Sequence, residues 1–224
     1  MMWTLLWLML LDAAPPGSPV SEETLNYSVN WPSGLSLGEA SFRARRAGER
    51  WELEFELEAA LPGFAVRDRY RSVASGDFCA VELEKQFRHG ARKGHERTGF
   101  DAKRGVAVRE TLGGGGKSEV PAPGCPRDAL GFLYYVRREL GQGRLPAPQE
   151  IFFGARYQVS VEYRGLQTVR VNEIPMQADR FQASVKGSAC EHSFEVFFAR
   201  DAARTPVLVR VPFPMGVFSM ELVR

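Results

Sequence analysis

The chain has 224 residues, which suits one domain of moderate size, and 44% of them are hydrophobic while 25% are charged. This balance excludes a disordered chain. The formal net charge of +2 gives no electrostatic reason to expect a nucleic acid or an anionic membrane surface as a partner.

The N-terminus has the pattern of an export signal. An apolar run extends from Met1 to Leu11 and is followed by the small residues Ala13 and Ala14. The run is shorter than the ~20 residues that a membrane span needs, and it has the length of a signal peptide, although no Lys or Arg precedes it. We predict a cleaved signal peptide over residues 1–14, a linker over 15–23 and a single β-rich domain over 24–224. An uncleaved anchor or a misplaced start codon are the alternatives.

Residues 40–88 alternate between apolar and charged side chains. Trp51, Leu53 and Phe55 alternate with glutamates, and the neighbouring segments alternate in the same way. Only a period of two sorts such residues onto separate faces, as in β-strands. The polar faces of four successive segments carry Arg, Glu, Arg and Glu, which predicts an antiparallel meander with its charges outside.

Turn signatures set the register of this meander. Three of them connect the four segments, namely Gly48-Glu49, Pro62-Gly63 and Gly76-Asp77. Two-residue turns at these places bring opposite charges together, as in the pairs Arg45–Glu52, Glu56–Arg69 and Arg71–Glu82. A slip of one residue would move every charge to the core side, so the pattern strongly specifies the register.

Two charged residues break the pattern. Asp68 and Lys85 fall on the apolar face, and the Gly76-Asp77 hairpin places them directly opposite each other, with Glu96 as a possible neighbour. Because an isolated buried charge costs several kcal/mol, these residues are expected to pair. They are either a structural ion pair or polar groups inside a ligand cavity.

One helix is predicted over about residues 126–141, with Pro126 at its first position and Asp128 in its first turn. Its apolar stripe favours packing on the apolar face of the sheet, with Arg137, Arg138 and Glu139 largely off the stripe. Strands resume after the helix and continue to the end of the chain, with a turn expected at Arg164-Gly165.

The three cysteines are Cys79, Cys125 and Cys190. Export permits a disulfide. The pair Cys79–Cys125 is favoured, because Cys79 ends a tight hairpin and Cys125 lies in a Gly/Pro-rich loop that can reach it. Three unpaired thiols are the alternative.

Catalytic and metal-binding motifs are missing from the sequence. His89 and His95 flank a short loop but have no clear third ligand, which makes a weak metal site. There is no nucleophile elbow and no Cys–His arrangement, and the four glycines at 113–116 lack the remainder of a phosphate loop. We therefore expect no enzyme activity, no metal and no cofactor.

The order of several short segments resembles a bacterial family of exported proteins called domain of unknown function 3108. The segments are Tyr27-Ser28-Val29-Asn30-Trp31, Leu37-Gly38-Glu39-Ala40, Val66-Arg67-Asp68-Arg69-Tyr70-Arg71-Ser72, Phe78-Cys79-Ala80-Val81-Glu82-Leu83-Glu84-Lys85, Arg127-Asp128-Ala129-Leu130, Phe198-Ala199-Arg200-Asp201-Ala202-Ala203-Arg204-Thr205-Pro206 and Pro214-Met215-Gly216-Val217-Phe218. The resemblance spans about residues 24 to 223. It implies a periplasmic or envelope location and a curved β-sheet domain, but no activity; of site residues it carries only the inward positions Asp68 and Lys85.

These observations predict a mainly β fold, in which a strongly twisted antiparallel meander forms a half-barrel or barrel around an apolar interior. The leading functional hypothesis is a non-catalytic carrier for a lipid or other hydrophobic ligand, by analogy of fold. The expected ligand-binding residues are Trp51, Phe55, Asp68, Tyr70, Leu83, Lys85 and Tyr134. The alternative is a structural or interaction module of envelope assembly, with a filled core and a protein partner.

Overall fold

The computed structural model describes residues 21–61, 63–122, 124–214 and 216–223. The predicted signal peptide and most of the predicted linker lie outside them. The strands are β1 (Glu23–Asn30), β2 (Ser36–Ala47), β3 (Arg50–Leu61), β4 (Phe64–Ala74), β5 (Ala80–His89), β6 (Arg92–Asp101), β7 (Val106–Thr111), β8 (Lys117–Pro121), β9 (Arg127–Asp128), β10 (Gln149–Phe152), β11 (Arg156–Val171), β12 (Ile174–Lys186), β13 (Glu191–Ala199), β14 (Pro206–Phe213) and β15 (Gly216–Val223). Helix α1 spans Ala129–Gly141.

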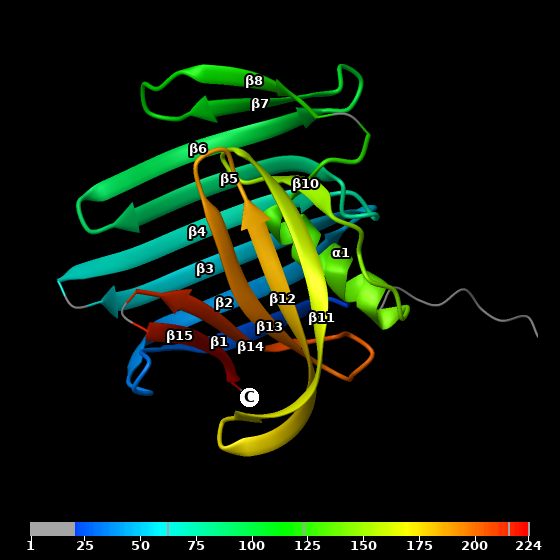
Figure 1. The fold of residues 1–224 in the computed structure, drawn as a ribbon. Coiled ribbons are helices and arrows are strands. Elements are labelled where there is room, and N and C mark those ends of the chain that lie inside the picture. The colour runs from blue at the N-terminus through cyan, green and yellow to red at the C-terminus, as the bar shows by residue number, and fades with distance from the viewer. Residues whose placement is uncertain (1–20, 62, 123, 215, 224) are drawn as a thin grey trace, which may run out of the picture.

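All of these strands belong to one sheet, in the order β8-β7-β6-β5-β4-β3-β2-β1-β15-β14-β13-β12-β11-β10-β9. Pairing is antiparallel except between β9 and β10. Because β8 and β9 are the two edges, the sheet does not close. It curls instead, so that β10–β13 cross in front of β2–β5 with α1 beside them (Figure 1). This half-barrel with one helix on its apolar face confirms the predicted fold class.

The first two hairpins of the meander have the predicted register. Arg45 lies opposite Glu52, and Glu56 lies opposite Arg69. The charges meet on the outer face, where the Arg69 guanidinium is 2.7 Å from Glu56 Oε1. Exposed pairs of this kind add only about 0.2–1 kcal/mol each, so their main effect is to fix the register.

The third hairpin differs from the prediction by two positions. Arg71 lies opposite Glu84 instead of Glu82. The connection between β4 and β5 is longer than a two-residue turn, because Phe78 has a φ of 60° and turns its ring into the core against Trp51. A shift of two residues keeps every side chain on its predicted face, which is why the alternation could not reveal it.

This shift separates Asp68 from Lys85, and their predicted pairing is wrong. Asp68 lies opposite Phe87, and its carboxylate contacts the His89 ring at 2.7 Å. Lys85 lies opposite Tyr70, and its cross-strand neighbour on β6 is Glu96. Both residues do face the concave side, as the sequence predicted.

Helix α1 begins three residues later than predicted. Asp128 is its N-cap residue and accepts a hydrogen bond from the Gly131 N–H at 2.9 Å. The Pro126 carbonyl accepts a hydrogen bond from Ala80 N instead of starting the helix. Ser72 Oγ also donates to the buried Asp128 carboxylate at 2.5 Å, and burial raises the pKa of Asp128 to about 6 despite these hydrogen bonds. The cap thus ties the helix to β4.

Two charged helical residues predicted off the apolar stripe are buried, because α1 packs between the two halves of the sheet. Arg137 is fully buried and Glu139 is 7% exposed. Arg137 forms a two-point ion pair with Glu23, and its Nε donates to the Ala203 carbonyl at 3.0 Å. Glu23, predicted to lie in a flexible linker, therefore begins the first strand and is fixed to the helix.

Two further features concern the connections. The structure joins Cys79 to Cys125, the pair that the sequence favoured, with their Cα atoms 4.9 Å apart, and Cys190 is free and exposed.

The turn predicted at Arg164-Gly165 is wrong, because β11 continues through it. Gly165 has a φ of +103° at a shift in the pairing with β12, which is the geometry of a bulge.

Candidate functional site

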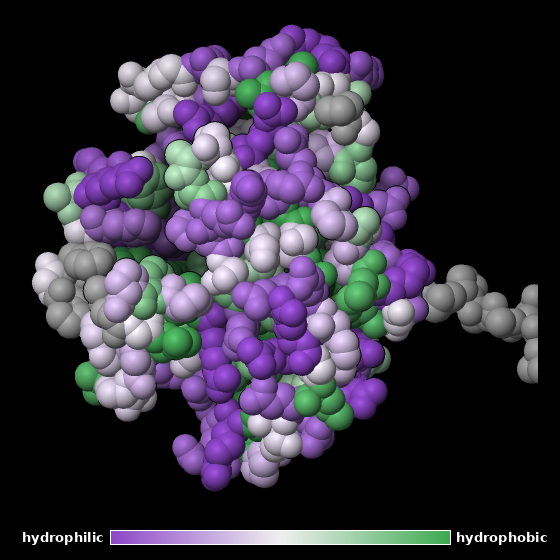
Figure 2. Space-filling model, viewed as in Figure 1, coloured by the Kyte–Doolittle hydropathy of each residue, from purple (hydrophilic) through white to green (hydrophobic). Residues whose placement is uncertain are grey.

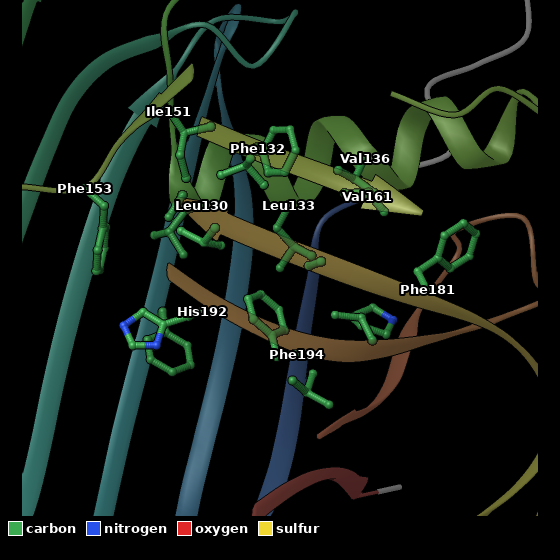
Figure 3. Close-up of a pocket in the computed structure, with 18 of the residues that line it drawn as sticks. Leu130, Phe132, Leu133, Val136, Ile151, Phe153, Val161, Phe181, His192 and Phe194 are labelled. Carbon is green, nitrogen blue, oxygen red and sulfur yellow. The ribbon is translucent and has the colours of Figure 1, made fainter. Parts of the chain in front are cut away.

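A cavity of about 520 Å³ lies between α1 and the concave face of the sheet (Figure 3). Its walls come from both halves of the sheet and are almost entirely aliphatic and aromatic. The lining residues are Tyr27, Phe42, Phe55, Tyr70, Ala129, Leu130, Phe132, Leu133, Val136, Ile151, Phe153, Tyr157, Val159, Val161, Phe181, Ala183, Val185, Cys190, His192, Phe194, Val196, Phe198, Pro206, Val209 and Met220.

Strands β11, β12 and β13 form one wall. Each contributes every second residue, such as Val159 and Val161 on β11, and Phe181 and Ala183 on β12. The period of two aims these side chains at the concave side and leaves the residues between them outside. The local pattern of the sequence therefore dictates which residues line this wall.

The opposite wall is a row of aromatic rings on β2, β3 and β4. Phe42 and Phe55 have ring centroids 4.6 Å apart, and Phe55 and Tyr70 have theirs 5.6 Å apart. Cross-strand contacts of this kind hold the rings in place. Tyr27 on β1 extends the row, and its hydroxyl donates to the Pro206 carbonyl at 2.7 Å, which satisfies its polar atom.

Helix α1 provides the third wall. Leu130, Leu133 and Val136 lie on the face that points into the cavity, together with Phe132 (Figure 3). The spacing of three and four residues places them on one side of a helix. The N-cap contacts Ser72 on β4, and Arg137 contacts Glu23 on β1 and the Ala203 carbonyl between β13 and β14. These contacts fix the helix wall relative to both halves of the sheet.

Few polar groups reach the cavity. His192 and Cys190 line it and are both exposed to solvent, so they lie where the cavity meets the surface. Most of the face shown in Figure 2 is hydrophilic, but a hollow beside β13 has apolar side chains in its depth. With so few polar atoms, the cavity can hold an apolar group by burial.

Of the seven predicted site residues, Phe55 and Tyr70 line the cavity. Trp51, Leu83 and Tyr134 do not; each is at most 2% exposed and packs in the core. Trp51 and Tyr134 both pack against Phe78, the residue whose inward turn the sequence did not predict, at centroid distances of 5.8 and 6.0 Å.

The two predicted polar residues lie near the cavity but not in its wall. Asp68 is held by His89. Lys85 lies behind the ring of Phe153, a cavity residue, with its Nζ 4.1 Å from the ring centroid. The Phe153 carbonyl accepts a hydrogen bond from Lys85 at 3.3 Å. Lys85 therefore touches the wall from outside.

The residues of the C-terminal strands were not predicted as cavity residues, although they form more of the lining than the residues that were predicted. The period of two was present, because Phe194, Val196 and Phe198 line the cavity. The signal was weaker than in the meander, because Phe197 between them is also apolar and is fully buried in a neighbouring core cluster. What local patterns do not show is that this face meets the aromatic row of β2–β4, since that depends on how far the whole sheet curls.

The histidines of β5 and β6 lie on opposite faces and have separate carboxylate partners. His89 contacts Asp68, and His95 contacts Glu84 at 2.6 Å. The described part of the chain contains no group of three or more His, Cys, Asp or Glu side chains that could hold a metal ion. Among the same residues, no helix has the length and apolar composition needed to cross a bilayer.

Comparison with known proteins identifies a family and a related fold. The family described as "Protein of unknown function (DUF3108)" matches residues 26–223. No curated protein matches the chain. Among solved structures, it is similar to a β-barrel-like protein of domain of unknown function DUF1849 from Brucella abortus, with a TM-score of 0.63 and 6% sequence identity, over 90% of this chain and 95% of that chain. At this identity the likeness concerns the fold alone.

Proposed function

This chain belongs to the DUF3108 family of proteins of unknown function, and from its cavity we propose that it is a non-catalytic carrier for a hydrophobic ligand such as a lipid. One observation carries the proposal. The space between α1 and the sheet is apolar, about 520 Å³ in volume, and lies within the usual range of ligand pockets.

The alternative, a module with a filled core, has less support. A tightly packed interior leaves few voids larger than a water molecule. The cavity of this chain is far larger than that, and aromatic rings from three different strands surround it. An apolar ligand in this space would bury the exposed faces of those rings, and each buried Å² of apolar surface contributes roughly 25 cal/mol.

We also propose that the protein is exported and acts in the periplasm or cell envelope. The disulfide between Cys79 and Cys125 supports this location, because structural disulfides persist mainly in oxidising compartments. A carrier in that aqueous space would shield the apolar part of its ligand from water.

Filling the cavity is the direct test. Ala183 lines the cavity, is 6% exposed and lies on β12 between Val161 of β11 and Phe194 of β13, so Ala183→Trp would place an indole in the ligand space. We expect this variant to lose uptake of the neutral apolar dye N-phenylnaphthylamine, measured by fluorescence, while its thermal unfolding stays cooperative.

The matched control is Ala60→Trp, at an exposed position of β3 that does not line the cavity. It should bind the dye as the natural chain does. Equal dye binding by both variants, or no binding by the natural chain, would contradict the carrier proposal.

A further inference from the structure

A charged cluster borders one end of the cavity. Figure 3 shows Phe153 at one end and Phe181 at the other. Behind Phe153, on the concave face of β5–β7, lie Lys85, Glu96 and Arg109. The ring of Phe153 thus separates an apolar space from two cations. An amphiphilic ligand has the matching arrangement, with an apolar chain next to a charged head group.

The cations hold the turn that carries Phe153. Lys85 donates to the Phe153 carbonyl at 3.3 Å, and Arg109 donates to the carbonyl of Gly154. Gly154 has a φ of +78°, and a Cβ there would come within 2.8 Å of Lys85 Nζ and 2.9 Å of Glu96 Oε2. The turn therefore rests its backbone directly on the charged cluster. Both cations therefore donate hydrogen bonds to neutral carbonyl oxygens. An anion could replace these oxygens as the acceptor.

The positive charge of Lys85 has only a distant counter-ion, and its hydrogen-bond donors are only partly used. Its side chain is 12% exposed, its Nζ is 3.9 Å from Glu96 Oε2, and that oxygen has no hydrogen-bond partner in the described part of the chain. An ammonium can donate three hydrogen bonds, and Lys85 makes one within the same residues. Burial lowers the pKa of Lys85, and Arg109 adds to this effect, while Glu96 and Asp68 act against it without cancelling it. Asp68 is itself engaged by His89.

We infer that Lys85 and Arg109 form a head-group subsite and that the ligand is an amphiphile with an anionic head, a carboxylate or a phosphate, at the Phe153 end of the cavity. This inference rests on the proposed carrier function and names the class of its ligand. Hydrogen bonds from ammonium or guanidinium groups to an anionic oxygen are roughly twice as strong as those between neutral groups. The head group therefore displaces the turn at residues 153–155 from the two cations, and the alkyl chain occupies the space lined by Phe55, Val161 and Phe181.

The test compares probes that share one alkyl chain and differ in the head group, namely dodecanoate, dodecyl phosphate and dodecanol. Each displaces N-phenylnaphthylamine from the full mature chain, below the concentration at which micelles form. We expect one of the anions to bind about tenfold tighter than dodecanol, which corresponds to one charge-assisted hydrogen bond. The preferred anion shows whether the natural head is a carboxylate or a phosphate.

Two substitutions are expected to act in opposite directions. Lys85→Gln should weaken binding of the preferred anion about tenfold and leave dodecanol unchanged, while Lys85→Arg should retain the preference. Glu96→Gln should tighten binding of the anion, because it removes the competing carboxylate. Lys117→Gln is the control, since that exposed lysine on β8 pairs with Glu110 away from the cavity.

The inference is overturned if the natural chain binds dodecanol as tightly as both anions, a comparison that needs no variant to fold. It is also overturned if Lys85→Gln weakens all three probes equally, because that result indicates a structural role alone. Absence of binding by the dye and by every probe would overturn the carrier function as well, so the two failures are distinguishable.

Discussion

Replacing Arg137 by methionine is expected to lower the free energy of unfolding by about 3–5 kcal/mol. Arg137 is fully buried, and its removal leaves the Glu23 carboxylate, which is 14% exposed, without its cation. Burial alone would lower the pKa of Arg137, but Glu23 beside it outweighs this effect and raises it, so the guanidinium is charged in the folded protein. The substitution also removes the hydrogen bond to the Ala203 carbonyl. Urea denaturation followed by circular dichroism measures the loss.

The control for Arg137 is an exposed pair of similar chemistry. Arg104 and Glu119 lie 2.9 Å apart with side chains 58% and 45% exposed, so Arg104→Met should cost less than about 1 kcal/mol. The double variant Arg137→Met/Glu23→Gln should recover part of the loss, because it leaves no isolated charge. A loss of stability for Arg137→Met no larger than that for Arg104→Met would show that the buried pair does not anchor the helix.

Removing the disulfide is the second large expected effect. Cys79 and Cys125 are 46 residues apart in the sequence, and closing a loop of that length in the unfolded chain corresponds to about 4 kcal/mol in the chain-entropy account. The bond joins the loop after β4 to the segment that leads into α1. Its loss should therefore loosen the helix wall as well as lower the urea midpoint of the Cys79→Ser/Cys125→Ser variant.

Cys190→Ser is the matched control for the disulfide, because Cys190 is free and exposed, and its urea midpoint should equal that of the natural chain. Reduction of the natural chain by dithiothreitol should reproduce the shift seen in the double variant. If the double variant and Cys190→Ser have the same midpoint, the bond does not stabilise the fold.

The sequence specified the meander where two kinds of local information agreed. Turn residues and charge complementarity together predicted the pairing of Arg45 with Glu52, because a shift of one residue would have buried every charge. At the third hairpin the Gly76-Asp77 signature indicated a two-residue turn that the structure does not have, and the alternation of charged and apolar residues could not correct it, because it tolerates a shift of two. The buried Phe78, with its positive φ, supplied that shift, and no pattern in the turn indicates that its side chain enters the core.

The candidate site was less predictable because it is assembled over long distances. Phe55 and Tyr70 could be predicted as inward-facing from the meander alone. Their neighbours across the cavity, such as Phe181, come from strands whose position depends on the curl of the whole sheet. The pair of Glu23 and Arg137 joins residues that are 114 positions apart in the sequence, beyond the reach of any local rule.

Native mass spectrometry of the protein, purified gently from the cells that make it and followed by lipid extraction, tests the carrier function most directly. We expect a stoichiometric complex with an anionic amphiphile, absent from the Ala183→Trp variant purified in parallel. A mass equal to that of the protein alone, with no uptake of added amphiphiles, would contradict the carrier function and favour a module that binds a protein partner.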